Sequence, residues 1–343
     1  MATIEDVAQA VGVAQSTVSG AFSGKKRMSP QRREEILRVA RELDYQPNLL
    51  AQRLREKGSS DSVTVFTTTD FGQETRTLRV LLDLLEEQGI NADCNAPPRR
   101  GENVHQRQIA ELNRARRFKP RAIVISLPAV HPDGLIEELK RFVRDAGILV
   151  CYTNGDPIDF ADCVTFDRYE STYGAIRYLL EQGHRKIGFN SHGNRPDNDA
   201  RLRALETALR EFDVPFNPQW VWKHCCYEAA GLALGRDFLA LGNRPTALHI
   251  INDMTAAAFI NVLWRAGLRV PDDVSVIGNE DAPIASAALV PLTTSRFPVE
   301  ALAKDVAELL ISRLKDGYDG APRQRKHQAE LILRGSVAPL EKF

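Results

Sequence analysis

The sequence predicts an α/β protein with a small helix-turn-helix head of three helices, a hinge helix and a large core of two parallel sheets. Two patterns predict this. Residues 3–23 show helical spacing of apolar residues on both sides of Gly12, and from residue 62 short β-rich runs alternate with helical stretches. At 343 residues the chain also exceeds the usual size of one domain, so more than one core is expected.

The first element is a helical hairpin over residues 3–23. Gly12 supplies the left-handed residue that lets the chain reverse. The apolar positions at helical spacing are Ile4, Val7, Ala8, Val13 and Val18. The outer face of the second helix then carries small polar side chains: Gln15, Ser16, Thr17 and Ser19. Such a face suits a DNA major groove about 12 Å wide, although an ordinary structural hairpin is the alternative.

A third helix and a hinge complete this part. Ser29-Pro30 is a strong helix start, with a hydroxyl N-cap and proline at the first helical position. The expected inner stripe is Ile36, Leu37, Val39, Ala40 and Leu43. Residues 45–48 break this helix, and 48–55 are helix-competent but too short to hold a helix alone in water. We therefore expect a hinge that becomes ordered on a partner.

Net charge is zero over the chain, but its distribution is uneven. Residues 1–60 hold ten Lys and Arg against seven Asp and Glu, a net of +3, so the remainder carries −3. The five Cys form no CxxC pair, which favours reduced, mostly buried thiols. No run has signal-peptide or membrane-span length, so we expect a soluble, cytoplasmic protein.

The core alternates strands and helices. The expected strands are 63–66, 122–125, 148–151, 186–189, 247–251 and 274–278. The expected helices are 78–88, 104–118, 134–146, 173–182, 201–212 and 255–266. This alternation indicates right-handed βαβ units and parallel sheets, with ligand sites at the carboxyl ends of the strands.

The order of hairpin, Ser29-started helix, Tyr45-Gln46-Pro47-Asn48 and leucine-containing hinge resembles the DNA-binding head of the lactose-repressor (LacI) family of bacterial transcription regulators. The resemblance implies a second helix in the major groove and paired hinge helices over the minor groove. It implies Gln15 and Ser16 as base readers, with Leu54 wedged into a base step and Ala51 beside it. The implied phosphate contacts are Thr3, Ser19, Ser29, Tyr45 and Asn48.

Two positions depart from the family pattern. Ala14 stands where Ser usually starts the recognition helix, which removes an N-cap worth about 1 kcal/mol. Gly20 stands where an Arg often reads guanine, a contact worth about 1–3 kcal/mol of discrimination. We expect an altered operator near that contact, with phosphate affinity supplied by Lys25, Lys26 or Arg27.

The core matches the same family from residue 164 to 294. Residues 164–188 carry the motif ending in Gly-His-Arg, and 201–209 match another motif, with Ala204 and Leu205 replacing its Gly and Phe. The resemblance runs from Thr3 to about Pro339 and implies a core of the periplasmic-binding-protein type. The expected boundaries are 1–47 for the head, 48–61 for the hinge and 62–339 for the core, with an N-subdomain of 62–158 and 295–321 and a C-subdomain of 159–294 and 322–339.

The resemblance also implies an effector site. Arg201 falls on the family's effector-binding arginine, close to Asp197, although it could instead pair with Asp199 on the surface. Asn252 and Glu280 follow two strands, where cleft residues belong, although either could cap the next helix. The weaker candidates are Tyr152, Tyr227 and Asp167.

His184 is a possible catalytic base, but it follows Gly183 at a helix end, so we expect it to cap carbonyls. No nucleophile triad, metal-ligand spacing or glycine-rich phosphate loop is present in the sequence. We therefore expect no enzyme, no cofactor and no metal.

Together these features predict a DNA-binding transcription regulator, a repressor whose affinity for a near-palindromic operator is set by a small-molecule effector, a sugar or sugar derivative, between the core subdomains. Only four residues follow Pro339, which is too short for a heptad, so we expect a homodimer without a tetramerising tail. The alternative is a solute-binding protein with the same core and no DNA function.

Overall fold

The computed structural model describes residues 3–23, 28–43, 45, 60–66, 72–94, 104–117, 120–127, 133–145, 147–153, 157–191, 197–224 and 227–340. The chain divides into two compact units, one of residues 1–61 with 117–121 and one of 62–116 with 122–343.

The head holds three helices, α1 Ile4–Val11, α2 Gln15–Ser23 and α3 Pro30–Glu42. Gly12 ends α1 with φ of +68°, the left-handed conformation that the sequence predicts. The buried core consists of Val7, Ala8, Val18, Ala21, Ile36 and Ala40. The prediction that Leu43 lies on the inner stripe is wrong, since it is 39% exposed. It follows the last turn of α3, where the chain leaves the helical register.

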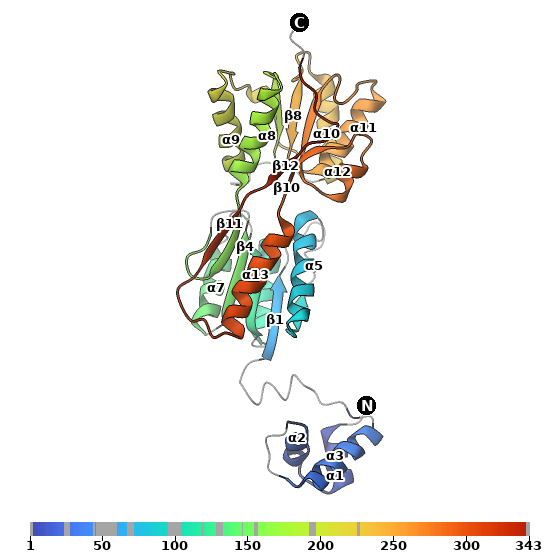
Figure 1. Ribbon diagram of the computed structural model, residues 1–343, viewed down its shortest axis with the longest axis vertical. Helices are drawn as coiled ribbons and strands as arrows, with labels where there is room; N and C mark the ends of the chain where they lie inside the picture. The colour runs from blue at the N-terminus through green and yellow to red at the C-terminus, as the bar shows by residue number, and fades with distance from the viewer. Residues whose placement is uncertain are drawn as a thin grey trace. The chain divides into compact units, whose positions relative to one another are not determined.

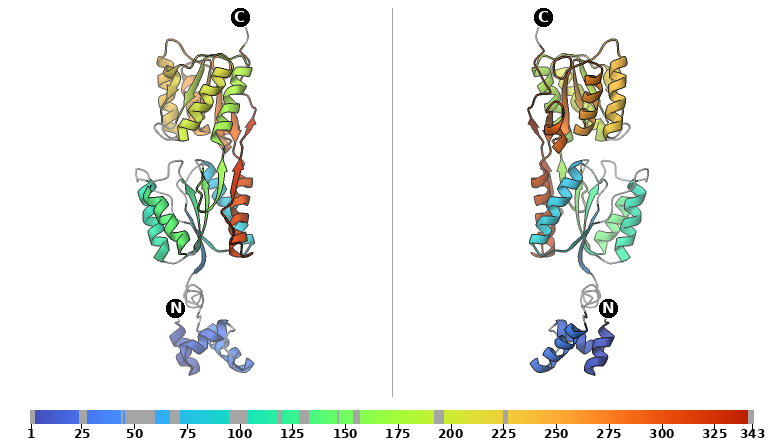
Figure 2. Two further views of the ribbon diagram at one scale, coloured as in Figure 1. Left: turned by 90° about the vertical axis from the view of Figure 1, so that its left-hand side faces the viewer. Right: turned by 90° about the vertical axis from the view of Figure 1, so that its right-hand side faces the viewer.

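The first sheet of the core has the strand order β11-β5-β4-β3-β1-β2. Its strands are β1 Ser60–Phe66, β2 Ala92–Cys94, β3 Pro120–Leu127, β4 Ile148–Thr153, β5 Asp162–Phe166 and β11 Gln324–His327. Helices α5 Gly72–Glu87 and α13 Val299–Leu314 cover one face, and α6 Val104–Arg117 and α7 Asp133–Arg144 cover the other (Figure 2). The apolar strands are thus buried on both faces, as parallel strands require.

The second sheet has the order β12-β10-β9-β8-β6-β7. Its strands are β6 Ile187–Asn190, β7 Val221–Trp222, β8 Ala247–Ile250, β9 Ser275–Glu280, β10 Thr293–Arg296 and β12 Glu330–Ile332. Its helices are α8 Arg168–Glu181, α9 Asp197–Glu211, α10 Tyr227–Ala240, α11 Asp253–Arg265 and the short α12 Pro283–Ala287. α8 and α9 lie on one side of β8, and α10, α11 and α12 lie on the other (Figure 1). Apart from antiparallel β12, the pairs are parallel.

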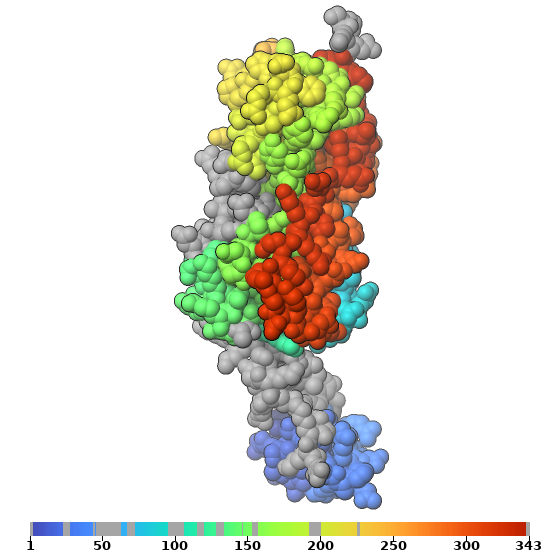
Figure 3. All heavy atoms as spheres, turned by 60° about the vertical axis from the view of Figure 1, so that its left-hand side comes forward, coloured from blue at the N-terminus to red at the C-terminus, as the bar shows by residue number. Residues whose placement is uncertain are grey.

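The chain crosses between the two sheets later than we expected at two places. We placed 159–294 and 322–339 in the C-subdomain, yet β5 and β11 pair with each other in the first sheet, with Cys163 in register with Gln324. Consequently the final part of the chain, red in Figure 3, lies on the surface of both lobes. β5 and β11 escaped sequence analysis because neither is a long apolar run bounded by turn residues.

The thiols are more varied than expected. Cys151 and Cys163 are buried in the first sheet, in register on neighbouring strands, as the sequence analysis expected of most thiols. Cys94, at the end of the short edge strand β2, is exposed instead.

Candidate functional site

In the head, the outer face of α2 carries the side chains that the sequence predicts to read bases. Gln15 and Ser16 are exposed, and Thr17 and Ser19 are half-buried. Val18 between them is fully buried and packs the helix onto the head core. The helix therefore presents small polar groups on one face, the arrangement that enters a major groove.

Two of the predicted phosphate contacts also act as helix caps. Thr3 forms a capping box with Asp6: its hydroxyl oxygen accepts from the Asp6 N–H at 3.2 Å, while its own N–H donates to the Asp6 carboxylate at 2.7 Å. Ser29 accepts from the N–H of Arg32 at 3.2 Å at the start of α3. Both caps are exposed, so their positions remain compatible with phosphate contact.

Two arginines that sequence reasoning missed join the helices of the head. Arg32 donates to the carbonyl of Val11 at 3.2 Å, and Arg33 donates to that of Ala21 at 2.9 Å. Tyr45, a predicted phosphate contact, packs edge-on against Phe22 with ring centroids 5.7 Å apart. The predicted DNA contacts that lie outside the described residues are Lys25, Lys26, Arg27, Asn48, Ala51 and Leu54.

In the core, Asn252 and Glu280 meet at the carboxyl end of the second sheet. The amide nitrogen of Asn252 donates to the Glu280 carboxylate at 2.9 Å. The amide oxygen of Asn252 accepts from the N–H groups of Met254 and Thr255, so the same side chain caps α11. The helix-cap alternative therefore holds for Asn252, and its role in effector binding stays a prediction.

Glu280 is held in an unusual conformation and charge state. Its φ is +107°, in the region that side-chain-bearing residues rarely adopt. Burial of the carboxyl group, together with the negative charge of Asp253, raises its pKa to about 7. This carboxyl can therefore exist in either protonation state near neutral pH.

Asp253, which the sequence analysis did not predict as a site residue, stabilises the backbone next to Glu280. It is fully buried, and its carboxylate accepts from the Thr294 hydroxyl at 2.6 Å and from the Ala282 N–H at 2.8 Å. Gly278 makes room for it, since a Cβ there would lie 2.2 Å from a carboxylate oxygen. Asp253 thus fixes the turn that follows Glu280, the last residue of β9.

Arg201 lies in the second turn of α9 and is only 4% exposed. Burial raises the pKa of Glu280 and lowers that of His249, and the positive charge of Arg201 opposes the first shift and adds to the second. The reading of Arg201 as a surface residue is therefore wrong, because helix α9 directs its side chain inward at this edge of the sheet. Asp197 begins α9, and its side chain lies outside the described part of the chain.

The three weaker candidates for the effector site, Tyr227, Tyr152 and Asp167, lie in different surroundings. Tyr227 begins α10 with φ of +57°, and its carbonyl accepts from the Thr255 hydroxyl at 3.0 Å. Tyr152 is buried in the core of the first lobe, where burial raises its pKa, and its role in effector binding stays a prediction. Asp167 caps α8 by accepting from the Glu170 N–H at 3.1 Å and pairs with Lys326, which is a structural role.

His184 is a structural residue, but not quite as expected. Its Nδ1 lies 2.9 Å from the Thr246 hydroxyl, and its Nε2 lies 3.1 Å from both the Ser275 hydroxyl and the Ala338 carbonyl. It therefore joins the strand ends to the C-terminal segment. The helix-end carbonyl at Leu180 is capped by Arg185 instead, at 2.8 Å.

A long-range contact joins the two lobes of the core at this edge. Arg76 on α5 donates to the main-chain carbonyls of Glu280 and Asp281, at 3.4 and 3.0 Å. Asp281 is itself held by Arg296 and Arg334, each at 2.7 Å. The turn that follows Glu280 is therefore in contact with a helix of the first lobe.

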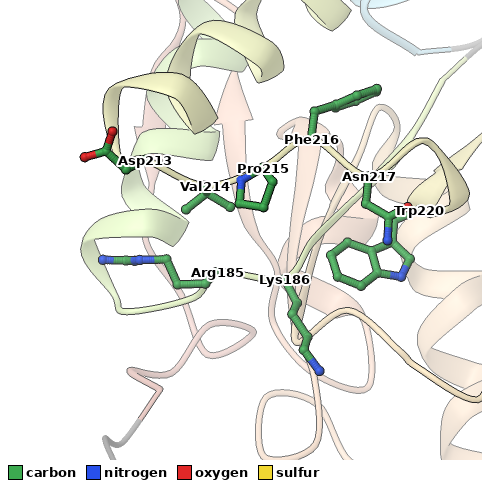
Figure 4. A pocket seen from close by; sticks show the side chains of 8 residues that line it. All are labelled: Arg185, Lys186, Asp213, Val214, Pro215, Phe216, Asn217 and Trp220. Atoms are coloured by element: carbon green, nitrogen blue, oxygen red, sulfur yellow. The ribbon is translucent and has the colours of Figure 1, made fainter.

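A pocket of about 400 Å³ lies at the opposite edge of the second sheet (Figure 4). Arg185 and Lys186, which precede β6, line it together with Phe216 and Trp220. Lys186 donates to Asn243 and the Trp220 indole donates to the Asn243 carbonyl, so these polar groups already have partners. The pocket lies at the amino ends of the strands, whereas ligands of such sheets bind at the carboxyl ends.

The described residues contain no cluster of His, Cys, Asp and Glu suited to a metal ion. Within the same part of the chain, every helix is too short or too polar to cross a membrane.

A three-helix head with an exposed polar helix face, followed by a two-lobed α/β core with buried polar groups at the strand ends, defines a DNA-binding regulator with a ligand-binding core. The description "Bacterial regulatory proteins, lacI family" matches residues 3–48, and "Periplasmic binding protein-like domain" matches 176–337. The chain belongs to the lacI family. It is a DNA-binding transcriptional regulator and not an enzyme.

Relatives match over the full length. The HTH-type transcriptional repressor PurR of Photobacterium profundum is 27% identical, over 99% of this chain and 100% of its own. The lac repressor dimer bound to operator and the anti-inducer ONPF has a TM-score of 0.79 at 19% identity, covering 98% and 99% of the two chains. The CelR–cellobiose complex has a TM-score of 0.69 at 23% identity, covering 98% and 100%.

Proposed function

We propose that this chain is a cytoplasmic repressor whose affinity for a near-palindromic operator is controlled by a small molecule bound at the carboxyl end of the second sheet. The observation that carries the proposal is the set of buried Arg201, buried Asn252 and half-buried Glu280 at that edge. Arginine, amide and carboxyl groups together can bind several hydroxyls or an acidic group of one ligand. The effector we infer is a sugar or a sugar derivative, since a CelR regulator of the same fold binds cellobiose.

The contact between the lobes suggests how the ligand acts. A molecule held by Glu280 and Arg201 would alter the turn that Arg76 contacts, and with it the angle between the lobes. The hinge residues 48–55 would then pair or separate according to that angle. Such coupling requires only that the ligand bind one lobe arrangement better than the other.

We further propose a homodimer, because a palindromic operator is matched by a two-fold axis. Large apolar side chains are exposed on and beside α11: Met254 is 42%, Trp264 is 53% and Leu289 is 56% exposed. α11 packs against α12, which precedes Leu289. This apolar surface suits a self-complementary interface, and the lac repressor of the same fold forms a dimer.

The experiment that tests the proposed function has two arms. The full-length protein is first incubated with random DNA, and the selected sequences are expected to show two inverted half-sites. The protein is then screened by thermal shift against sugars, sugar acids and nucleobases, and a true effector should raise the melting temperature as its concentration rises. Selection of no DNA sequence at all would sink the proposal, whatever the ligand screen shows.

A further inference from the structure

Arg76 on α5 of the first lobe holds two main-chain groups of the second lobe. Its guanidinium donates to the carbonyl of Asp281 at 3.0 Å and to that of Glu280, the last residue of β9, at 3.4 Å. We call this pair of residues the 280–281 bend. Because the acceptors are main-chain oxygens, the contact depends on where the bend lies and not on the rotamer of a second side chain.

The 280–281 bend has a backbone conformation that residues with side chains rarely adopt. Glu280 has φ of +107° and Asp281 has φ of +48°, so two consecutive residues lie in the region that favours glycine. Strain of this kind persists only where the surrounding structure holds the chain in place. The bend should therefore relax when its contacts are removed.

Contacts within the second lobe hold part of the bend. The Asp281 carboxylate accepts from Arg296 and from Arg334, each at 2.7 Å. Its main-chain N–H donates to the Thr294 hydroxyl at 3.4 Å. Arg76 differs from these partners because it belongs to the other lobe. It can hold the bend only in an arrangement of the lobes that brings α5 against it.

The same helix contacts the segments that connect the two lobes. Val80 lies one turn beyond Arg76 and packs on a buried cluster that contains two phenylalanines. Phe166 ends β5, before the chain enters α8, and Phe297 follows β10, before it enters α13. Their rings meet edge to face with centroids 4.2 Å apart, where the chain passes between the sheets. A rotation of the lobes about these segments would move α5 relative to the bend.

We propose that Arg76 is a positioning residue of the effector site: it holds the 280–281 bend in its strained conformation in one arrangement of the lobes and releases it in another. This inference rests on the proposed function, in which Glu280 belongs to the effector site. In the held bend the Glu280 carboxylate accepts from Asn252 at 2.9 Å. The effector therefore binds the arrangement in which Arg76 contacts the bend, which supplies the difference in affinity that allosteric control requires.

Hydrogen exchange in the ligand-free, full-length protein tests the contact. Arg76→Met removes the N–H donors, and the amides of residues 279–282 should then exchange about fivefold or more faster than in wild type. Arg79→Met, at an exposed position on α5, is the matched control and should leave this exchange unchanged. Arg76→Lys keeps a positively charged donor and should retain part of the protection.

Operator affinity separates a link between the lobes from a local packing contact. The probe is the DNA sequence that the wild-type protein selects from a random pool, measured without ligand. Arg76→Met should raise or lower the affinity for this DNA by about fivefold or more, because it shifts the balance between lobe arrangements. Arg296→Met removes a contact to the same bend from within the second lobe. It should speed exchange at 279–282 but leave operator affinity at the wild-type value.

Two results would overturn the inference. Exchange at 279–282 that is unchanged by Arg76→Met would show that the bend is held without α5. Faster exchange in Arg76→Met with unchanged operator affinity would show that the contact is local and does not report the arrangement of the lobes. Neither result affects the selection of DNA by the wild-type protein, which tests the proposed function separately.

Discussion

At the residue scale, single side chains serve the fold and the site together. Asn252 caps α11 and holds Glu280, and Asp253 next to it ties down the turn that follows Glu280. The sequence predicts Asn252 and Glu280 from their places after strands. It does not reveal Asp253 or His249, because their importance comes from burial and from partners distant in the chain.

The base-reading assignment predicts different effects for two head residues. Gln15→Ala should relax base preference at one position of each half-site, because Gln15 is exposed on α2 and can reach a base edge. Arg27→Ala should instead weaken binding to all sequences similarly. It should also reduce the slope of log affinity against log salt concentration by about one, the change expected for one lost phosphate contact. Selection on random DNA and salt titrations measure the two effects. An unchanged sequence preference in Gln15→Ala would show that Gln15 does not contact a base edge.

The buried histidine predicts a pH effect on stability. The pKa of His249 is about 3 in the folded protein and 6.5 when exposed, so the unfolded state binds the proton first and stability is lost as pH falls below 6.5. His249→Phe should therefore be more stable than wild type, with an advantage that grows by about 1–3 kcal/mol between pH 7 and pH 4.5. Urea unfolding of both proteins at the two pH values measures this difference.

The variant must be compared with wild type because two carboxyls change the free energy of unfolding with pH in the direction opposite to His249. The pKa values of Asp253 and Glu280 are raised to about 7, so they favour the folded state as pH falls from 7 toward 4. They are present in both proteins and cancel in the difference. An advantage of His249→Phe that did not change with pH would show that the imidazole is already paired or charged.

At the scale of elements, the sequence predicts the long apolar strands and misses the short or polar ones. β3, β4 and β8 are continuous apolar runs, whereas β10 and β11 read Thr-Thr-Ser-Arg and Gln-Arg-Lys-His. α10 was missed because of its glycines. A Cβ on Gly231 would lie 2.3 Å from the Thr255 carbonyl oxygen, so these glycines serve the close approach to α11 and not a turn.

The hinge, residues 48–55, lies outside the described residues and carries a prediction from sequence. Leu54 is an apolar residue flanked by Arg53 and Arg55, which suits a minor-groove wedge between cationic neighbours. Leu54→Ala should cost a few kcal/mol of specific operator binding while leaving ligand affinity and melting temperature intact. Amide exchange at 48–55 should be fast in the free protein and slow on operator.

Fluorescence anisotropy with operator and with random DNA measures the loss of specificity. Operator affinity unchanged by Leu54→Ala, or amides protected without DNA, would show that the core and the head are coupled by another route.

At the scale of the whole molecule, the fold follows from alternating patterns, but the assembly of the site does not. Arg201, Asn252 and Glu280 come from three separate elements of the second lobe, and Arg76 comes from the other lobe. From the sequence, only the family resemblance assigned Arg201 and Glu280 to the same site. Periodicity shows which face of an element is buried, not which buried side chains meet.

The proposed dimer makes a prediction at this scale. Trp264→Glu places a charge in the apolar surface around α11 and should shift the protein to monomer in light scattering. Operator affinity should fall with it, because one subunit holds only one half-site. Phe216→Glu is the matched control, because Phe216 is also an exposed aromatic residue, 38% exposed, but does not lie on α11. This variant should remain dimeric. A Trp264→Glu protein that stays dimeric would place the interface on another surface.

The central claim is that ligand at the carboxyl edge of the second sheet controls operator binding. The direct measurement is the affinity of the full-length protein for its selected operator, with and without a saturating ligand from the thermal-shift screen. We expect a change of about tenfold or more, within the usual range of allosteric coupling, and Arg201→Met should remove the change while retaining operator binding. An operator affinity that stays the same while the ligand demonstrably binds the core would contradict the account.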